Sequence, residues 1–208
     1  MRKSATDPAW RLRKDRVAIL KGHSGRLRFL VLLMTACVWA SPSGAGDNSS
    51  LVSEYQVKAA FLYNFAKFIE WPAEAFSSGN APIQLCLAGE DPFGPLLEQT
   101  IQGKAAQGRE MRIKRLKENE DLRACHILFV GPAEDKRLAQ IMDRLNGASV
   151  LTVGETHNFT RLGGVITLGL EQNKVRFEVN LQSAERARLK VSSKLLTLAR
   201  VVRSEAKD

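Results

Sequence analysis

Histidine and cysteine are the residues of this 208-residue chain that could hold a metal ion or supply a nucleophile, and each occurs three times. Neither type shows a ligand spacing such as HExxH or CxxC, so the sequence predicts no metal site. The Gly-x-Ser-x-Gly turn of serine hydrolases is also missing from the sequence. We therefore expect no catalytic residue and no cofactor, and a binding protein rather than an enzyme. The residues concerned are His23, His126, His157, Cys37, Cys86 and Cys125.

One turn has the position of a phosphate-binding loop without its composition. Gly89–Gly94 follows an expected strand and precedes an expected helix, which is where α/β proteins bind phosphates. Its two acids would repel a phosphate, its proline removes a backbone donor, and neither glycine-rich fingerprint is present. We expect a capped turn, with Asp91 as the N-cap and Pro92 as the first helical residue.

The positive charge is concentrated at the N-terminus. The formal net charge is +9, but residues 1–40 hold nine of the 31 basic and two of the 22 acidic residues. The other 168 residues then carry 31 − 9 = 22 basic and 22 − 2 = 20 acidic groups, a net charge of +2. A nucleic-acid partner is therefore not expected once the N-terminal segment is removed.

That segment has the pattern of an export signal. Phe29–Val38 is an uncharged apolar run directly after two arginines, too short to cross a bilayer but as long as a signal-peptide core. We expect residues 1–40 to be a signal peptide with a long basic leader, cleaved after Ala40 or alternatively after Ala45, and residues 41–52 to be a flexible linker. This places the mature protein in the periplasm. A lipid anchor through Cys37 stays open, because residues 34–37 resemble a lipoprotein box.

Cys86 and Cys125 remain in the mature chain. Two cysteines in an exported protein indicate one disulfide, although each lies in an apolar run and two buried free thiols are the alternative.

The elements that must position these residues follow from hydrophobic periodicity. Apolar side chains at intervals of four and three predict a helix over 54–71, with Ser53 as N-cap and Pro72 as its end. Six of the fourteen aromatics fall in this helix and cover more than one side of it, which fits either a helix sandwiched in the core or a protein–protein contact. We expect further helices after Asp91 and over 134–145, 184–189 and 193–202. Strands are expected over 82–88, 111–116, 125–130, 150–153, 164–170 and 174–180.

This order predicts an α/β fold over residues 53–203 as a single domain. Alternating strands and helices indicate a mostly parallel sheet with helices on both faces, and the last two strands form an antiparallel hairpin at one edge. A flavodoxin-like strand order would place the strands of Cys86 and Cys125 side by side.

Two long motifs carry a family resemblance. Lys58–Pro72, KAAFLYNFAKFIEWP, resembles the opening helix of the YfiR family. Val175–Ala184, VRFEVNLQSA, followed by Ser192–Ala199, SSKLLTLA, is similar to that family's C-terminal signature. Cys86 and Cys125 fall where the family's longer-range disulfide does. The shorter family disulfide has no counterpart, because residues 153–161 contain no cysteine.

The resemblance implies a periplasmic protein without enzymatic activity that binds the periplasmic part of an inner-membrane GGDEF-type diguanylate cyclase and holds it inactive. Such inhibition lowers cyclic di-GMP and biofilm formation, and an outer-membrane lipoprotein can sequester the inhibitor. A homodimer is left open. The alternative is a periplasmic small-ligand binding or sensor protein that acts independently of a cyclase, and a periplasmic enzyme is a third class.

We expect the partner surface around Phe159, Glu171 and Phe177. Phe159 is an aromatic in a polar loop, where an interface anchor or a lid over a small cluster is expected. Glu171 stands at the hairpin turn and can offer a charge. Phe177 alternates with charged neighbours, so core packing and partner contact are both open.

Overall fold

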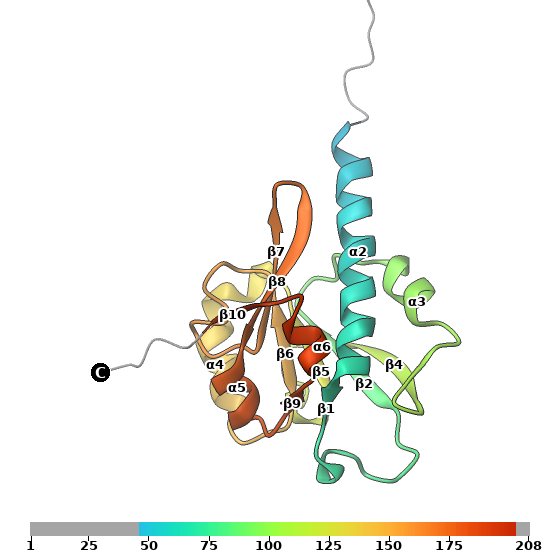
Figure 1. Cartoon of the computed structure of the whole chain (residues 1–208), viewed down its shortest axis with the longest axis vertical. Coiled ribbons are helices and arrows are strands. Elements are labelled where there is room, and N and C mark those ends of the chain that lie inside the picture. The colour runs from blue at the N-terminus through green and yellow to red at the C-terminus, as the bar shows by residue number, and fades with distance from the viewer. Residues whose placement is uncertain (1–45, 203–208) are drawn as a thin grey trace, which may run out of the picture. The chain divides into compact units, whose positions relative to one another are not determined.

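A computed structural model describes residues 46–202 of the protein (Figure 1). The expected signal peptide and residues 41–45 of the expected linker lie outside the described residues. The α-helices are α2 (Gly46–Phe68), α3 (Pro95–Ile101), α4 (Leu138–Arg144), α5 (Leu181–Arg186) and α6 (Ser193–Leu196), with 3-10 helices η1 (Ala73–Ala75), η2 (Leu122–Ala124) and η3 (Pro132–Arg137). The strands are β1 (Ile69–Glu70), β2 (Ile83–Ala88), β3 (Ala105–Ala106), β4 (Arg109–Leu116), β5 (Ile127–Val130), β6 (Leu151–Gly154), β7 (Ile166–Glu171), β8 (Lys174–Asn180), β9 (Lys190–Val191) and β10 (Arg200–Val202).

The main sheet confirms the predicted α/β class. Its eight strands run in the order β10-β8-β7-β6-β5-β2-β4-β3, and within it β4, β2, β5, β6 and β7 are parallel to one another. Taken in chain order, these five strands form the 2-1-3-4-5 arrangement of flavodoxin-like sheets. The β7–β8 hairpin is antiparallel as predicted, and β10 extends the sheet beyond it by pairing in parallel with β8.

Alternation along the strands divides the core into two layers. In β2, Leu85 and Leu87 face the layer that α2, α3 and α6 cover, whereas Cys86 and Ala88 face the layer that α4 covers. The strands in the middle of the sheet are buried on both faces, which explains their continuous apolar runs. Figure 1 shows the long helix α2 lying along one side of the sheet.

Helix α2 is longer at its start and shorter at its end than expected. It begins at Gly46, inside the stretch expected to be a flexible linker, so Ser53 is a helical residue and not the N-cap. It ends at Phe68 because the next two residues form β1, in which Ile69 pairs with Val191 of β9. Strand pairing therefore ends the helix before Pro72 can.

The prediction of a helix over 193–202 is wrong in its second half. Helix α6 stops at Leu196, and β10 then pairs residue by residue with β8, Arg200 opposite Glu178 and Val202 opposite Asn180. The apolar spacing of this segment fits a helix, but its β-branched Val201 and Val202 also suit a strand, and the open edge of β8 decides between them. The sheet therefore ends in a strand that periodicity does not reveal.

The predicted disulfide is present in the structure. Cys86 lies in β2 and Cys125 lies two residues before β5, and because β2 and β5 are paired the two Cα atoms are 5.9 Å apart. The bridge closes a loop with a sequence separation of 39 residues and faces the layer under α4.

Candidate functional site

A cavity of about 440 Å³ opens beside the β7–β8 hairpin. Its walls come from the hairpin, from the segment between α6 and β10, and from the loop after β6. The lining residues are Glu155, His157, Thr167, Gly169, Leu170, Glu171, Arg176, Phe177, Glu178, Thr197, Leu198, Ala199 and Arg200. We call this cavity the hairpin cleft. It brings together two of the three residues predicted to bind a partner, Glu171 and Phe177, and leaves out Phe159.

The rim of the hairpin cleft exposes apolar side chains. Leu198 is 70% exposed and Leu170 is 50% exposed, and Val201 of the neighbouring β10 is also exposed. Large aliphatic side chains in water are individually ordinary, but Leu170 and Leu198 line the same concave surface. Such an apolar rim around a cleft is a surface that could contact a protein partner.

Charged residues cross the same rim. Arg200 of β10 places Nη1 3.1 Å from the Glu178 carboxylate and 3.7 Å from that of Glu171. The Arg200 and Glu171 side chains are mostly exposed, so this pair contributes about 0–1 kcal/mol to stability and can exchange partners at little cost.

The hairpin turn explains the position of Glu171. The turn residues Gln172 and Asn173 both have positive φ, 50° and 59°, as the tight turn between twisted strands requires. The turn therefore follows Glu171 directly and leaves its carboxylate in solvent at the end of β7, as expected.

Phe177 is a core residue, and the expectation that its ring could meet a partner is wrong. It is 3% exposed, and its ring centroid lies 5.3 Å from those of Phe61 and Phe65 on α2. Because Phe177 faces α2 and its charged neighbours face away, it forms the base of the hairpin and not part of its accessible surface. The aromatic residues Phe61 and Phe65 thus belong to the sandwiched-helix alternative.

Phe159 is also buried, which corrects its expected role as an exposed anchor. It is 1% exposed and packs in the layer under α4. A Cβ atom on Gly154 or on Gly164 would overlap the Phe159 ring, so the ring lies directly against both backbones. The loop is polar, but it folds back over the sheet and two glycines open a place for the ring. The sequence signal for this packing was the position of Gly154 and Gly164, five residues before and five residues after Phe159.

A buried ionic cluster lies at one end of the hairpin cleft, and sequence reasoning missed it. The Lys58 ammonium of α2 is paired with the carboxylates of Glu54, one turn earlier, and Glu155, in the loop after β6. The Lys58 and Glu155 side chains are only 5% and 8% exposed. The Tyr55 hydroxyl donates to the other Glu155 oxygen at 3.3 Å. A lysine among the buried positions of an otherwise apolar helix was the available signal.

The cluster shifts the proton affinity of its members. Burial raises the pKa of Tyr55, and the neighbouring negative charge of Glu155 raises it further. Burial alone would lower the pKa of Lys58, but its hydrogen bonds to Glu155 and Glu54 outweigh that effect and the pKa is raised. Lys58 therefore stays charged at neutral pH and links α2 to the rim of the cleft.

The crevice at the switch point of the sheet, between the carboxyl ends of β2 and β5, is the usual ligand site of such folds. Here the Glu134 side chain lies against Gly89 at the end of β2, since a Cβ atom on Gly89 would lie 2.8 Å from Glu134 Cγ. Glu134 and Glu118 are both paired with Arg137 nearby. A carboxylate in this position disfavours a phosphate ligand.

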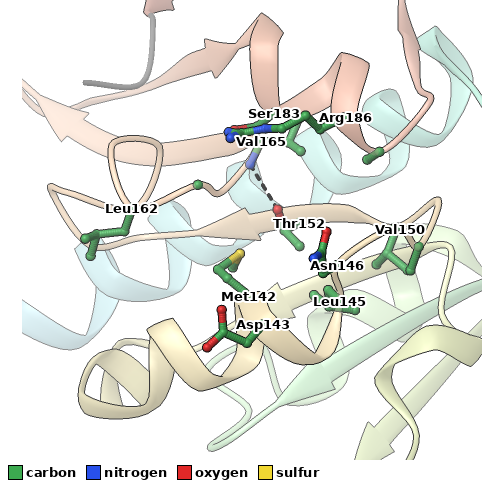
Figure 2. Close-up of a pocket in the computed structure, with 14 residues that line it drawn as sticks. Met142, Asp143, Leu145, Asn146, Val150, Thr152, Leu162, Val165, Ser183 and Arg186 are labelled. Atoms are coloured by element: carbon green, nitrogen blue, oxygen red, sulfur yellow. Dashed lines mark hydrogen bonds between the residues drawn. The ribbon is translucent and has the colours of Figure 1, made fainter. Parts of the chain in front are cut away.

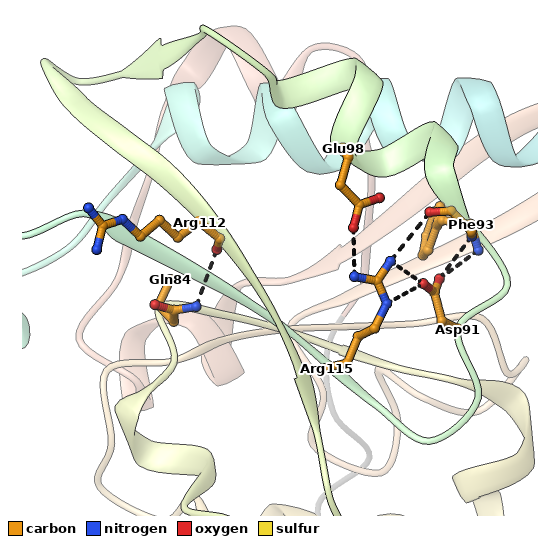
Figure 3. Close-up of polar contacts among 7 residues, drawn as sticks. Gln84, Asp91, Phe93, Glu98, Arg112 and Arg115 are labelled. Atoms are coloured by element: carbon orange, nitrogen blue, oxygen red, sulfur yellow. Dashed lines mark hydrogen bonds and ion pairs between the residues drawn. The ribbon is translucent and has the colours of Figure 1, made fainter.

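The 89–94 turn is capped, but not as predicted. Asp91 accepts hydrogen bonds from the backbone N–H groups of Phe93 and Gly94, at 2.8 and 3.2 Å, and α3 begins only at Pro95 (Figure 3). Asp91 therefore caps the turn and not the helix. Arg115 of β4 donates to Asp91 at 2.8 Å and to Glu98 of α3 at 2.6 Å, so one arginine links this turn to the helix that follows it.

A second cavity, of about 250 Å³, lies between α4 and the loop before β7 (Figure 2). It is lined mainly by aliphatic and small side chains, and within it the Val165 N–H donates to Thr152 Oγ1 at 2.9 Å. Its charged residues, Asp143 and Arg186, come from α4 and α5, and Arg186 donates to Ser183 Oγ. No nucleophile and base are paired there.

The described residues 46–202 contain no group of three or more acidic, histidine or cysteine side chains that could hold a metal ion. Over the same residues, no helix is both long and apolar enough to span a membrane. His157 lines the hairpin cleft, whereas His126 is held by backbone groups at the opposite end of the strands.

Comparison with known proteins identifies the family. A family model described as YfiR/HmsC-like matches residues 55–200, which is most of the chain and includes both the hairpin cleft and the disulfide. The chain belongs to the YfiR/HmsC-like family. The YfiR/HmsC-like family is regulatory and non-catalytic, and in general periplasmic.

One solved structure is similar over part of its length. It is a conserved domain protein from Vibrio cholerae O1 biovar El Tor strain N16961, with 9% sequence identity and a TM-score of 0.44. The match covers 57% of this YfiR/HmsC-like chain and 54% of that chain, so the chain matches about half the length of that structure. So low a TM-score does not establish a shared fold.

Proposed function

We propose that this protein is a periplasmic inhibitory binding protein that represses an inner-membrane GGDEF-type diguanylate cyclase and thereby lowers cyclic di-GMP and biofilm formation. The observation that carries the proposal is the YfiR/HmsC-like match across residues 55–200.

The hairpin cleft is the surface we assign to the cyclase. Its rim combines the exposed aliphatic side chains of Leu170 and Leu198 with the Glu171 carboxylate. Apolar contact supplies most of the free energy of association in such interfaces, while exposed charges steer the partner and select it. The Glu171–Arg200 pair is weak enough for Glu171 to be offered to a cation of the partner.

The remaining parts of the proposal concern location and other partners. Export by the N-terminal segment places the protein in the periplasm, with a lipid anchor through Cys37 as the alternative. An outer-membrane lipoprotein is a second proposed partner, which would release the cyclase by sequestering this protein. Intact-mass measurement of the periplasmic form distinguishes cleavage after Ala40 from a lipidated Cys37.

The decisive experiment changes the rim of the cleft without touching the core. Leu198→Asp and Glu171→Lys are each expected to weaken capture of the cyclase from detergent-solubilised membranes by about 30-fold or more, the size of a hot-spot effect. Cellular cyclic di-GMP should rise in parallel. Leu162→Asp is the matched control, because Leu162 is 57% exposed but lies at the second cavity.

Circular dichroism of each variant establishes that the fold is retained. If cells carrying both Leu198→Asp and Glu171→Lys keep cyclic di-GMP repressed, the cleft is not the cyclase surface. If the wild-type protein captures no GGDEF protein from membranes, the inhibitory function itself is wrong.

A second candidate function rests on the volume of the cleft. About 440 Å³ is enough for a small molecule, which fits a periplasmic ligand-binding or sensor protein that works without a cyclase. Native mass spectrometry of protein purified from periplasm tests it: a bound small molecule that Leu198→Asp abolishes would support this candidate over the first.

A further inference from the structure

The connection between β1 and β2, residues 72–82, is weakly anchored. We call it the 72–82 segment. Most of its residues are exposed or half-buried, and its own hydrogen bonds are those of η1 and one short turn, Ala81 N–H to Ser78 O at 3.1 Å. Segments with few buried contacts open locally at a lower free energy than the domain unfolds.

Two side chains hold this segment, His126 just before β5 and Arg109 of β4. The Nε2 of His126 lies 3.1 Å from the Ala75 carbonyl oxygen, and the His126 ring stacks on Phe76 with centroids 4.4 Å apart. The His126 carbonyl oxygen also accepts a hydrogen bond, at 3.1 Å, from Nε1 of Trp71, the residue that precedes the segment. His126 is 8% exposed, so these contacts are shielded from water.

The hydrogen bonds of His126 require a neutral ring. The Gln84 backbone N–H of β2 lies 2.9 Å from Nδ1 and can only donate, so Nδ1 must be unprotonated. The single proton of the neutral ring is then on Nε2, which donates to Ala75. If Nδ1 took up a proton, its N–H would face the Gln84 N–H, and two donors cannot hydrogen-bond to each other. The protonated ring therefore could not keep both the Gln84 and the Ala75 hydrogen bonds.

The charged group that acts on the ring comes from β4. The Arg109 guanidinium lies 3.7 Å from the centre of the Phe76 ring and donates to the carbonyl oxygens of Ala81 at 2.8 Å and Ser78 at 3.3 Å. The other neighbours, Trp71 and Phe76, are uncharged. A fixed cation on the strand side of the segment opposes a second positive charge on His126.

We propose that His126 is a pH-sensitive anchor: proton uptake by its imidazole releases the 72–82 segment from β2 and β5 while the rest of the domain stays folded. The inference is independent of the proposed function, because it concerns a connection at the opposite end of the strands from the hairpin cleft and needs no partner.

The direction of the pH effect follows from the ring. Burial lowers the pKa of His126, the Arg109 charge lowers it further, and the Ala75 hydrogen bond opposes both. In the open segment the ring regains an ordinary pKa of about 6.5. The closed form is therefore fully favoured above about pH 6.5, and the opening equilibrium rises as the pH falls, by at most about tenfold per pH unit for one proton.

Amide hydrogen exchange measured by NMR between pH 5 and 7.5 tests this proposal on the wild-type chain. After correction for intrinsic exchange, the opening constants of the Ala75, Phe76 and Ala81 amides should increase by up to about tenfold per unit below pH 6.5. The β5 amides should stay far better protected. His126→Asn keeps an acceptor for Gln84 but cannot titrate, so its profile should be flat.

His157→Asn is the matched control, since His157 is in a loop at the hairpin cleft and its loss should leave the profile unchanged. A flat wild-type profile, or a slope that persists in His126→Asn, overturns the proposal. If His126→Asn does not fold, NMR titration of the His126 ring C–H signals in the wild-type chain takes its place. A midpoint at or above pH 6.5 contradicts the proposal. A midpoint below pH 6.5, with segment opening that follows the same titration, supports it.

Discussion

The Lys58 ammonium on α2 and the Glu155 carboxylate after β6 form a buried ion pair between residues 97 positions apart in the chain. Glu155 also lines the hairpin cleft, so the pair joins the N-terminal half of α2 to the proposed partner surface. A buried ion pair stabilises a fold little more than two apolar side chains of similar size would. Removing one partner is nevertheless strongly destabilising, because the other charge stays buried without a counter-charge.

Replacing one member of this pair should therefore destabilise the domain strongly. Lys58→Met leaves the Glu155 carboxylate buried without its cation, at an expected cost of about 3–5 kcal/mol in the free energy of unfolding. Adding Glu155→Met should recover much of that loss. Urea denaturation measures both, and Lys114→Met is the control, because its pair with Glu120 is largely exposed and should contribute less than about 1 kcal/mol. Simple additivity of the two changes would show that Lys58 and Glu155 are not coupled.

The packing of Phe159 gives a second prediction. Gly154→Ala would push a methyl group into the Phe159 ring and should cost about 1–3 kcal/mol, whereas Phe159→Ala should cost about 3–5 kcal/mol. In the double variant the ring is gone, so the Gly154→Ala penalty should largely disappear. Gly169→Ala is the control, since nothing lies within 4 Å of its added methyl group. Thermal denaturation that shows Phe159→Ala at wild-type stability would contradict the buried position of this ring.

The disulfide should contribute much of the stability of the domain. Breaking the disulfide, which closes a loop with a sequence separation of 39, should lower the free energy of unfolding by about 4 kcal/mol on the chain-entropy model. For a domain of this size that loss lowers the Tm by on the order of 10 °C. We expect Cys86→Ala/Cys125→Ala to show this loss with or without reductant. Wild-type protein should show it only in reductant, and a Tm that reductant leaves unchanged would count against the bridge.

Truncating a side chain at the rim of the cleft should change the free energy of unfolding far less than truncating one at its base. Leu198→Ala should change the free energy of unfolding by no more than about 0.5 kcal/mol, because Leu198 is largely exposed. Phe177→Ala should cost about 3–5 kcal/mol, because its ring packs on Phe61 and Phe65. Chemical denaturation of the two variants measures the contrast. Similar losses in both would mean that Leu198 is not a rim residue and that its functional variants report on folding.

The parallel sheet and the disulfide could be predicted because strong local signals agree with the global fold. Strands β2 and β5 are continuous apolar runs bounded by turns, and their placement next to each other follows from a common strand order. Strand β8, Lys174–Asn180, was predicted to the residue, because alternation and a hairpin turn mark both of its ends.

What could not be predicted depends on contacts that form only in the folded chain. The spacing of residues 193–202 fits a helix, and only the free edge of β8 turns its end into β10. Phe159 lies in a polar loop, and only the approach of two glycine backbones buries it. Lys58 has the type of a surface residue, and its burial depends on Glu155, 97 residues later, as well as on Glu54. Each of these depends on a contact that local patterns do not contain.

The contact of α2 with β8 has a consequence for how the protein folds. Phe61 and Phe65, near the start of the described chain, complete their packing only on Phe177, more than a hundred residues later. The first strand, β1, likewise pairs with β9 near the C-terminus. Contacts of such high sequence separation make folding slow, since long loops must close before they form. The packing of α2 and the pairing of β1 therefore cannot be completed during synthesis until the last quarter of the chain is available.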